Sequence, residues 1–165
     1  MPLETELARL TAGWPRAPLL DPSALDEAAE TLGIRWPDDY RALISEHDGV
    51  EGTIGPWYVA MTAADSLVDD NRSDDDGAPG VVFIGSDGGE ERIAYDRTTL
   101  ELLLIRSDDD GSQWINLGPN LAEAFAHFER DDVFDNPRYH EPVQSPPAVW
   151  PPDWREKIAA QIRET

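Results

Sequence analysis

Residues 32–50, LGIRWPDDYRALISEHDGV, decide the fold of this chain. Trp36 and Tyr40 begin a series of apolar side chains at helical spacing, so the stretch predicts a helix with one apolar face. Pro37 suits the first helical position, where its missing N–H is not needed. Gly49 suits the left-handed residue that ends a helix. We therefore expect a helix that organises the core, with Trp36 and Tyr40 largely buried, and not a catalytic site.

The segments on either side of this helix predict short elements separated by turns. Amphipathic spacing predicts further helices, one of them opened by Asp21-Pro22 and another by a capping box formed by Thr62 and Asp65. Apolar runs between glycine-containing turns predict strands that pair in antiparallel fashion. The predicted helices cover residues 3–12, 22–32, 63–71 and 121–128, and the predicted strands cover 53–60 (beginning near Trp57), 81–84, 92–95, 100–105 and 113–117.

The order of these elements predicts an α+β fold, in which helices pack around one mainly antiparallel sheet. A chain of 165 residues is long enough for one domain with a real core, and we expect that domain over residues 1–135. Residues 136–165 are predicted to be a proline-rich connector that ends in a helix capped by Asp153. The apolar side chains of that helix are Trp154, Ile158 and Ile162. They would be buried on the domain or on a partner, and we favour the domain.

The formal net charge of -21 limits the partners of the protein. Nucleic acids and anionic membranes would be repelled, so neither is expected as a partner. A basic protein surface is the natural complement, although acidity that serves only solubility explains the charge equally well. The chain has no cysteine, no signal peptide at its N-terminus and no apolar run near the roughly 20 residues of a membrane span. We expect a soluble, cytoplasmic protein.

The residues that commonly carry catalysis are scattered. His47, His127 and His140 lack metal-ligand spacing, and structural roles are expected for the first two because they lie at the ends of predicted helices. The acidic runs 74–76 and 108–110 are each followed by glycine, but neither fits the register of a calcium-binding loop. The sequence therefore predicts no catalytic residue, no cofactor and no metal site.

Two segments of this sequence resemble the SUKH superfamily, also called the Smi1/Knr4 family. Residues 32–41 followed by Asp48-Gly49 are similar to its pattern of an apolar residue, Pro-x-x-Tyr, a helix and Asn-Gly. Trp36 stands where leucine is commoner in the family, and Asp48 where asparagine is commoner. Residues 83–89, FIGSDGG, resemble its strand and turn segment "G-x-D-G".

The resemblance continues to the amphipathic helix at residues 121–128, so it covers roughly residues 20–130. It implies an α+β domain with a mainly antiparallel sheet. Most bacterial members look like immunity proteins, which bind and neutralise a polymorphic or contact-dependent toxin, often a nuclease or deaminase. A non-enzymatic regulatory or scaffold module of the same family is the alternative. The family motifs are fold-making, so they carry over no catalytic residue.

A protein inhibitor of this charge would be steered toward the basic groove that a nuclease needs for its substrate. We therefore predict a basic toxin domain as the partner, bound by acidic turns with one aromatic anchor. In a meander, alternate turns lie at opposite ends of the sheet, so these residues are not all expected on one surface. The candidate partner-binding residues are Trp57, Asp74, Asp75, Asp76, Glu90, Glu91, Asp108, Asp109 and Asp110.

Overall fold

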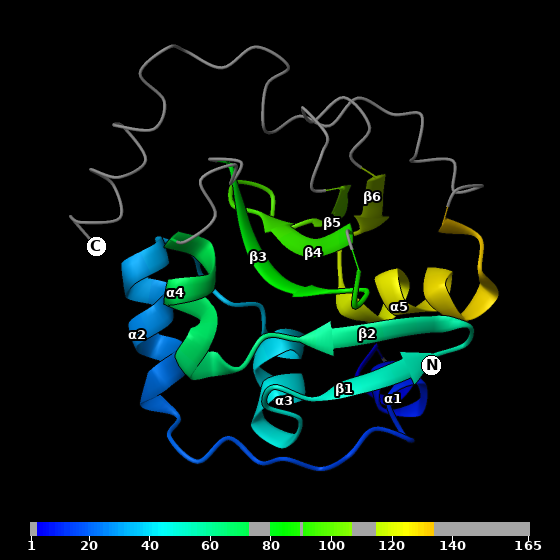
Figure 1. Ribbon diagram of the computed structural model, residues 1–165, viewed down its shortest axis with the longest axis horizontal. Helices are drawn as coiled ribbons and strands as arrows, with labels where there is room; N and C mark the ends of the chain where they lie inside the picture. The colour runs from blue at the N-terminus through cyan, green and yellow to red at the C-terminus, as the bar shows by residue number, and fades with distance from the viewer. Residues whose placement is uncertain (1–2, 73–79, 90, 107–114, 134–165) are drawn as a thin grey trace.

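The computed structural model describes residues 3–72, 80–89, 91–106 and 115–133 (Figure 1). The predicted α+β fold with one antiparallel sheet is confirmed. In chain order the elements are α1 (Leu3–Leu10), α2 (Ser23–Leu32), α3 (Asp38–Glu46), β1 (Glu51–Ile54), β2 (Trp57–Met61), the 3-10 turn η1 (Ala64–Ser66), α4 (Leu67–Arg72), β3 (Val81–Ser86), β4 (Glu91–Asp96), β5 (Leu102–Arg106), β6 (Ile115–Gly118) and α5 (Leu121–Arg130). The predicted connector and the helix after Asp153 lie outside the described residues.

The sheet is a meander of six strands in the order β1-β2-β3-β4-β5-β6, and each neighbouring pair is antiparallel. The strand predicted to begin near Trp57 is confirmed as β2, but β1 was not predicted, because the chain turns at Gly55-Pro56 and makes a hairpin of two strands. Gly55 has φ +56°, and a Cβ there would lie 2.8 Å from the Cα of Glu129. Glycine is needed at this turn because the backbone is left-handed and the end of α5 lies against it.

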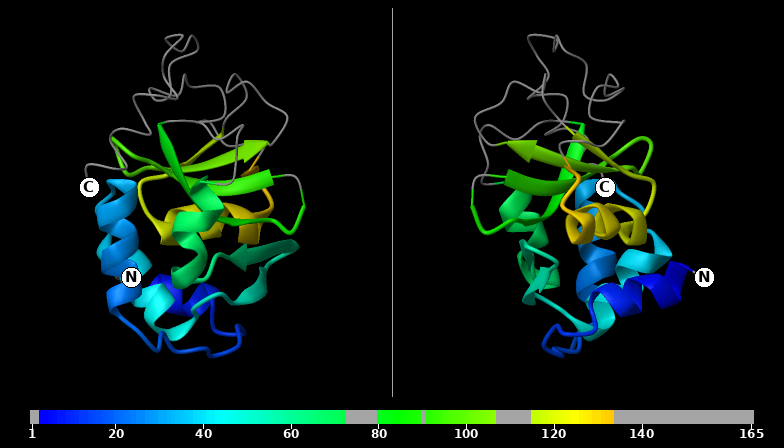
Figure 2. Two further views of the ribbon diagram at one scale, coloured as in Figure 1. Left: turned by 60° about the vertical axis from the view of Figure 1, so that its left-hand side comes forward. Right: turned by 90° about the vertical axis from the view of Figure 1, so that its right-hand side faces the viewer.

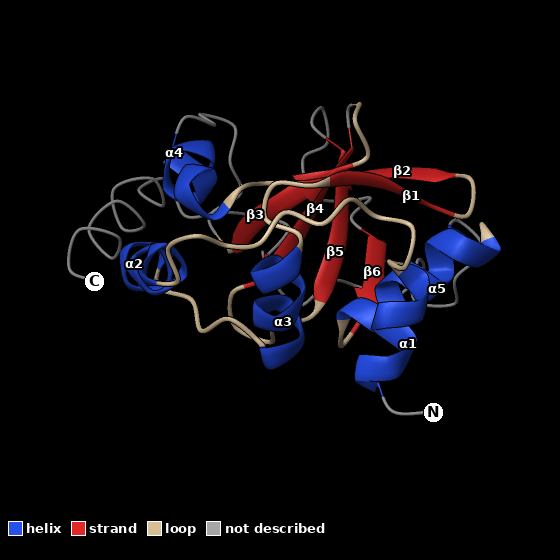
Figure 3. Cartoon of the chain, turned by 90° about the horizontal axis from the view of Figure 1, so that it is seen from below, coloured by secondary structure: helices blue, strands red, loops and turns tan. Residues whose placement is uncertain are grey.

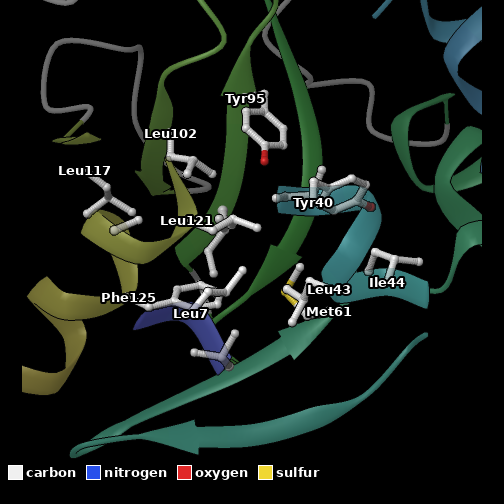
Figure 4. Packing of buried hydrophobic residues seen from close by; sticks show 14 of the residues in the cluster. Leu7, Tyr40, Leu43, Ile44, Met61, Tyr95, Leu102, Leu117, Leu121 and Phe125 are labelled. Atoms are coloured by element: carbon white, nitrogen blue, oxygen red, sulfur yellow. The ribbon is translucent and has the colours of Figure 1, made fainter. Parts of the chain in front are cut away.

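The helix α3 organises the core, as the sequence predicts. Tyr40 is 0% exposed, and its ring lies 4.8 Å from the ring of Trp36 and 5.8 Å from that of Tyr95 in β4. Trp36 is buried as well, and its Nε1 donates to the carbonyl of Leu25 in α2. Figure 4 shows Tyr40 and Tyr95 in one cluster with Phe125 of α5. One apolar core thus joins α2, α3, α5 and the sheet.

The helix ends differ in detail from the prediction. Pro37 precedes α3 in an extended conformation (ψ 153°), so it lies one residue before the helix. Gly49 is left-handed at φ +67°, but α3 has already ended at Glu46. The capping box of Thr62 with Asp65 does not form. The N–H of Ala64 instead donates to the carboxylate of Asp48, which comes from the other side of the β1–β2 hairpin.

The sheet has two apolar faces. Most helices lie on one side of β3–β6, with α3 and α5 under the strands and α1 against α5 (Figure 3). The helices α2 and α4 pack together along the β3 flank (Figure 2). The side chains that point away from the main core form a second buried cluster, which we call the outer cluster. It consists of Val81, Phe83, Ala94, Leu103 and Ile105.

The helix α4 also closes the open edge of β3. The side-chain amide of Asn71 donates to the carbonyl of Phe83 at 3.0 Å and accepts from its N–H at 2.8 Å. These two bonds replace a neighbouring strand, because β2 pairs with β3 only at Gly85 and Ser86. Within the described part of the chain, no helix has the length and apolarity to cross a membrane.

Candidate partner-binding surface

The segment around Asp48 and Gly49 serves the fold. The Asp48 carboxylate accepts from the N–H of Ala64 at 2.7 Å and fixes the start of η1. A Cβ on Gly49 would come within 3.0 Å of the Cβ of Ala63. The pair therefore ties the end of α3 to the segment after β2. This contact positions the β1–β2 hairpin relative to α3. That the segment has no catalytic role stays a prediction.

The segment Gly85–Gly88 has a comparable role in the turn between β3 and β4. The Asp87 carboxylate accepts from the N–H groups of Gly89 and Glu91, and the Ser86 hydroxyl accepts from that of Gly88. Gly88 is left-handed at φ +83°, and a Cβ there would lie 2.6 Å from the ring of Tyr58. A short carboxylate and two glycines thus build a tight turn that lies directly beside β2.

The strand register shows which turns share an end of the sheet. Glu91, the first residue of β4, is paired with Arg106, the last residue of β5. Ser86, the last residue of β3, is paired with Ala60 of β2. The β3–β4 turn, the exit of β5 and the neighbourhood of Tyr58 therefore lie at one end of the sheet. We call this end the turn end; its described residues are Glu51, Tyr58, residues 86–89, Glu91 and Arg106.

Trp57, the predicted aromatic anchor, faces the core side at the turn end. Its ring is half-buried and stacks on Phe128 of α5 at 4.8 Å, and its Nε1 donates to the Asp131 carboxylate at 2.9 Å. These contacts join β2 to the end of α5. Whether Trp57 also contacts a partner stays a prediction.

Tyr58 points to the opposite face of the strand and is 41% exposed. Its hydroxyl donates to the Glu51 carboxylate of β1 at 2.5 Å. Large tyrosines with one polar tip are typical anchors of protein interfaces. Tyr58 is not among the residues predicted from the sequence, because the strand register decides which of its alternate side chains face solvent. An exposed aromatic next to a carboxylate is nevertheless the kind of pair expected in an interface.

The segments that carry the acidic candidates leave the sheet at both of its ends. Asp74–Asp76, Glu90 and Asp108–Asp110 lie outside the described residues, so only the points where their segments leave the sheet are known. Glu90 and residues 107–114 are attached to the turn end. Residues 73–79 precede Val81, which pairs with Asp96 at the other end. The expectation that these turns do not share one surface stays a prediction.

Further exposed acids lie on the flank formed by α2 and α4, and the sequence analysis did not single them out. They are Asp26, Glu27, Glu30, Asp65 and Asp69. Asp26 forms an ion pair with Arg41 at 3.0 Å. The apolar stripe of α2 already indicated that Glu27 and Glu30 face solvent. The described surface therefore carries a second group of acidic side chains on this flank, apart from those at the turn end.

The described histidines have structural contacts. His47 donates from Nδ1 to the carbonyl of Pro15 at 2.7 Å, and its ring meets that of Trp14 edge to face. His127 contacts the Asp132 carboxylate at 2.7 Å. In the part of the chain that the structure describes, no group of three histidine or acidic residues is arranged to hold a metal ion.

Comparison with known proteins places this arrangement in a family. No curated protein matches the chain. A family model described as the SMI1 / KNR4 family (SUKH-1) matches residues 19–129, which span α2 to α5 and the whole sheet. The match includes both motifs whose turn-forming contacts are described above. It covers well over half of the sequence, and the chain therefore belongs to the SMI1/KNR4 family (SUKH-1).

Proposed function

We propose that this protein is an immunity protein that binds and neutralises a cognate bacterial toxin without catalysing a reaction. The toxin is a polymorphic or contact-dependent one, and its toxic domain is basic. The protein acts in the cytoplasm, where a nuclease toxin would meet its nucleic acid substrate. Family membership over residues 19–129 supports this proposal, since bacterial members of the family resemble immunity proteins.

The net charge of -21 is the observation that carries the choice of partner. A nuclease must present a cationic groove to bind nucleic acid. A strongly acidic protein is drawn to that groove over a distance of about 10 Å at 0.1 M salt and places carboxylates where phosphates would bind. Neutralisation then needs only occupancy of the groove, so no reactive group is required of the inhibitor.

We place the contact at the turn end of the sheet. Tyr58 is the aromatic anchor there, and Glu51 orients its hydroxyl. The two acidic groups attached to this end, Glu90–Glu91 and Asp108–Asp110, supply the carboxylates. Trp57 stands behind them and fixes the strand to α5. This arrangement combines one amphipathic aromatic with surrounding charge, as interfaces with a central anchor do.

The first experiment uses the toxin domain encoded next to the gene for this protein. Expression of that domain alone should stop growth of a bacterial host, and co-expression of the immunity protein should restore it. The purified pair should form a stable complex. Growth arrest that persists despite abundant folded protein, with no complex detected, would contradict the proposal. A gene neighbourhood without a secreted toxin, together with capture of a cellular regulator, would favour the regulatory module instead.

The second experiment uses two variants with the same change of charge at opposite ends of the sheet. One carries Asp108→Asn, Asp109→Asn and Asp110→Asn, and the matched control carries Asp74→Asn, Asp75→Asn and Asp76→Asn. Stopped-flow association with the toxin domain is measured at two ionic strengths. The turn-end variant should associate more slowly and with a flatter salt dependence than the control. Equal rates for both variants would contradict the turn end as the contact, and rates independent of salt would contradict steering by charge.

A further inference from the structure

We propose that the chain's own C-terminal segment, residues 134–165, covers the outer face of the sheet. In this arrangement the amphipathic helix predicted after Asp153 lies on the outer cluster, with Trp154, Ile158 and Ile162 against it. The proposal concerns the fold beyond the family region and does not depend on the toxin as partner.

The outer cluster contains no apolar side chain from a described helix. Its five side chains, Val81, Phe83, Ala94, Leu103 and Ile105, are at most 5% exposed. All five belong to β3, β4 and β5, and the apolar residues of the described helices belong to the main core on the other side. In Figure 1 the described helices lie below and to the left of these strands. Arg92, ion-paired with Asp70 of α4, covers the Phe83 ring. We infer that the cover of the other four side chains comes from chain outside the described ranges.

The strands themselves require a cover on both sides. Two strands contain continuous apolar runs, Val81–Ile84 and Leu102–Ile105. In the strand between them, Ile93–Tyr95 places apolar side chains on both faces of the sheet. Such runs are typical of strands that are buried on both faces, whereas a sheet with one wet face alternates apolar and polar residues. An uncovered outer face would expose isoleucine, leucine and phenylalanine side chains together.

The size of the cluster suits one helix. Three strands about 4.8 Å apart make a patch roughly 10–14 Å wide, which is close to the 10–12 Å diameter of a helix with its side chains. Polar groups border the patch. The Arg92 guanidinium lies 3.9 Å from the centre of the Phe83 ring, and the Asn116 amide donates to the Glu101 carboxylate. A single amphipathic helix, and not a larger domain, matches these limits.

The C-terminal segment has the length to reach this face. It begins after Val133, which is 1% exposed near the end of α5 on the core side. The proline-rich stretch 141–152 spans about 3.1 Å per residue when extended, and its roughly 35 Å exceeds the width of a six-stranded sheet at about 4.8 Å per strand. The helix that follows would therefore be able to lie on the face opposite to α5.

Charge and composition also favour this occupant. Four of the 13 basic residues of the chain lie in the segment, so it is nearly neutral while the rest of the chain is strongly acidic. A second copy of the chain would bring a charge of -21 against the same charge, which opposes self-association. The internal stretches outside the described ranges are 73–79, Glu90 and 107–114; they are acidic and contain one large apolar side chain, Trp114. The C-terminal segment contributes three such side chains at helical spacing.

The test uses the full chain with labelled isoleucine, leucine and valine methyl groups. We expect nuclear Overhauser effects between the methyls of Ile158 or Ile162 and those of Leu103 or Ile105. Ile158→Ser with Ile162→Ser should abolish these effects and shift the methyl resonances of the outer cluster. The matched control, Glu156→Ser with Arg163→Ser, changes the opposite side of the same predicted helix without changing net charge, and it should leave both unchanged.

Three outcomes would overturn the proposal. The first is that the outer cluster shows contacts to Trp114 and none to the C-terminal segment. The second is that the contacts appear only between differently labelled molecules in a mixed sample, which would identify a second copy as the cover. The third is that the Ile158 and Ile162 methyls show no contact with the cluster at all. Each of these is read from the unmodified chain, so the result does not depend on whether the serine variant folds.

Discussion

Tyr40 provides the sharpest test of the core, because its ring and its hydroxyl are expected to have opposite effects on stability. The ring is fully buried between Trp36 and Tyr95. The hydroxyl is buried too, and within the described part of the chain it has no hydrogen-bond partner. Burial, with a further contribution from the charge of Asp48, raises the pKa of Tyr40 above its usual value. The phenol is therefore neutral throughout the physiological range and acts as an apolar ring with one unsatisfied polar atom.

The two substitutions separate these effects. Tyr40→Ala removes the ring and leaves a cavity, so it should lower the free energy of unfolding by about 3–5 kcal/mol. Two aromatic contacts, each about 0.5–1.5 kcal/mol, form part of that loss. Tyr40→Phe keeps the ring and removes a hydroxyl whose burial without a partner costs about 1–3 kcal/mol. It should leave stability unchanged or raise it by roughly 1 kcal/mol, because the phenylalanine ring fits the same space.

Urea unfolding of the full chain, followed by far-ultraviolet circular dichroism, measures both values. Tyr58→Ala serves as the control, because that tyrosine is 41% exposed and should cost less than about 1 kcal/mol. A loss of more than about 1 kcal/mol for Tyr40→Phe would refute the assignment of an unpaired hydroxyl. A similarly small loss for Tyr40→Ala and Tyr58→Ala would refute the central place of α3 in the core.

Three further predictions concern turns and pH. Gly55→Ala should lower the free energy of unfolding by about 1–3 kcal/mol in the same assay. The alanine Cβ would lie 2.8 Å from the Glu129 backbone, and the residue would have to keep the left-handed φ of +56°. An unchanged midpoint would show that the turn can move away from α5. Asp87→Ala should cost about 1 kcal/mol and speed amide exchange in the β3–β4 turn, because two N–H groups lose their acceptor, and unchanged exchange would argue against that role. The pKa of Asp132 is raised by desolvation but lowered more by hydrogen bonds from His127 and the neighbouring arginine, so it lies below its usual value. The ionised Asp132 therefore stabilises the fold fully above the pKa that this group has in the unfolded chain, about 4, and this stabilisation is lost as pH falls through its lower pKa in the folded chain. The difference in free energy of unfolding between the native chain and Asp132→Asn should shrink from pH 6 to pH 3. A difference that stays constant over this range would contradict the prediction.

The elements whose signals are local were predictable from the sequence. The spacing of apolar residues gave α2, α3 and α5, and the apolar runs gave β3 to β6, because these patterns depend only on neighbours in the chain. The β1–β2 hairpin was missed since Gly55-Pro56 is not one of the common two-residue turns, and its geometry depends on α5. The start of η1 was assigned to Thr62, whereas the acceptor is Asp48, a contact that only the folded chain reveals.

The candidate surface was harder to predict for a related reason. Neighbouring side chains of a strand point to opposite faces of the sheet, so either Trp57 or Tyr58 faces outward. A shift of β2 by one residue in its pairing would exchange the two. The pairing of Glu91 with Arg106 decides that the acidic groups at 90–91 and 108–110 leave the same end of the sheet. Sequence composition supplied the net charge of the chain, but which charged segments leave the same end of the sheet could be seen only from the register of the strands.

The contact between α1 and α5 limits how early the domain can complete its fold while the chain is being synthesised. Arg9 of α1 pairs with Glu129 of α5 at 2.9 Å, and Leu7 and Leu10 are buried in the same core. Among the described helices, α1 is the first to leave the ribosome, and it can be buried only after α5 has been synthesised. At about 5–20 residues per second, the interval between them is roughly ten seconds. The main core can therefore be completed only after α5 has been synthesised, so this domain is expected to finish folding late in synthesis.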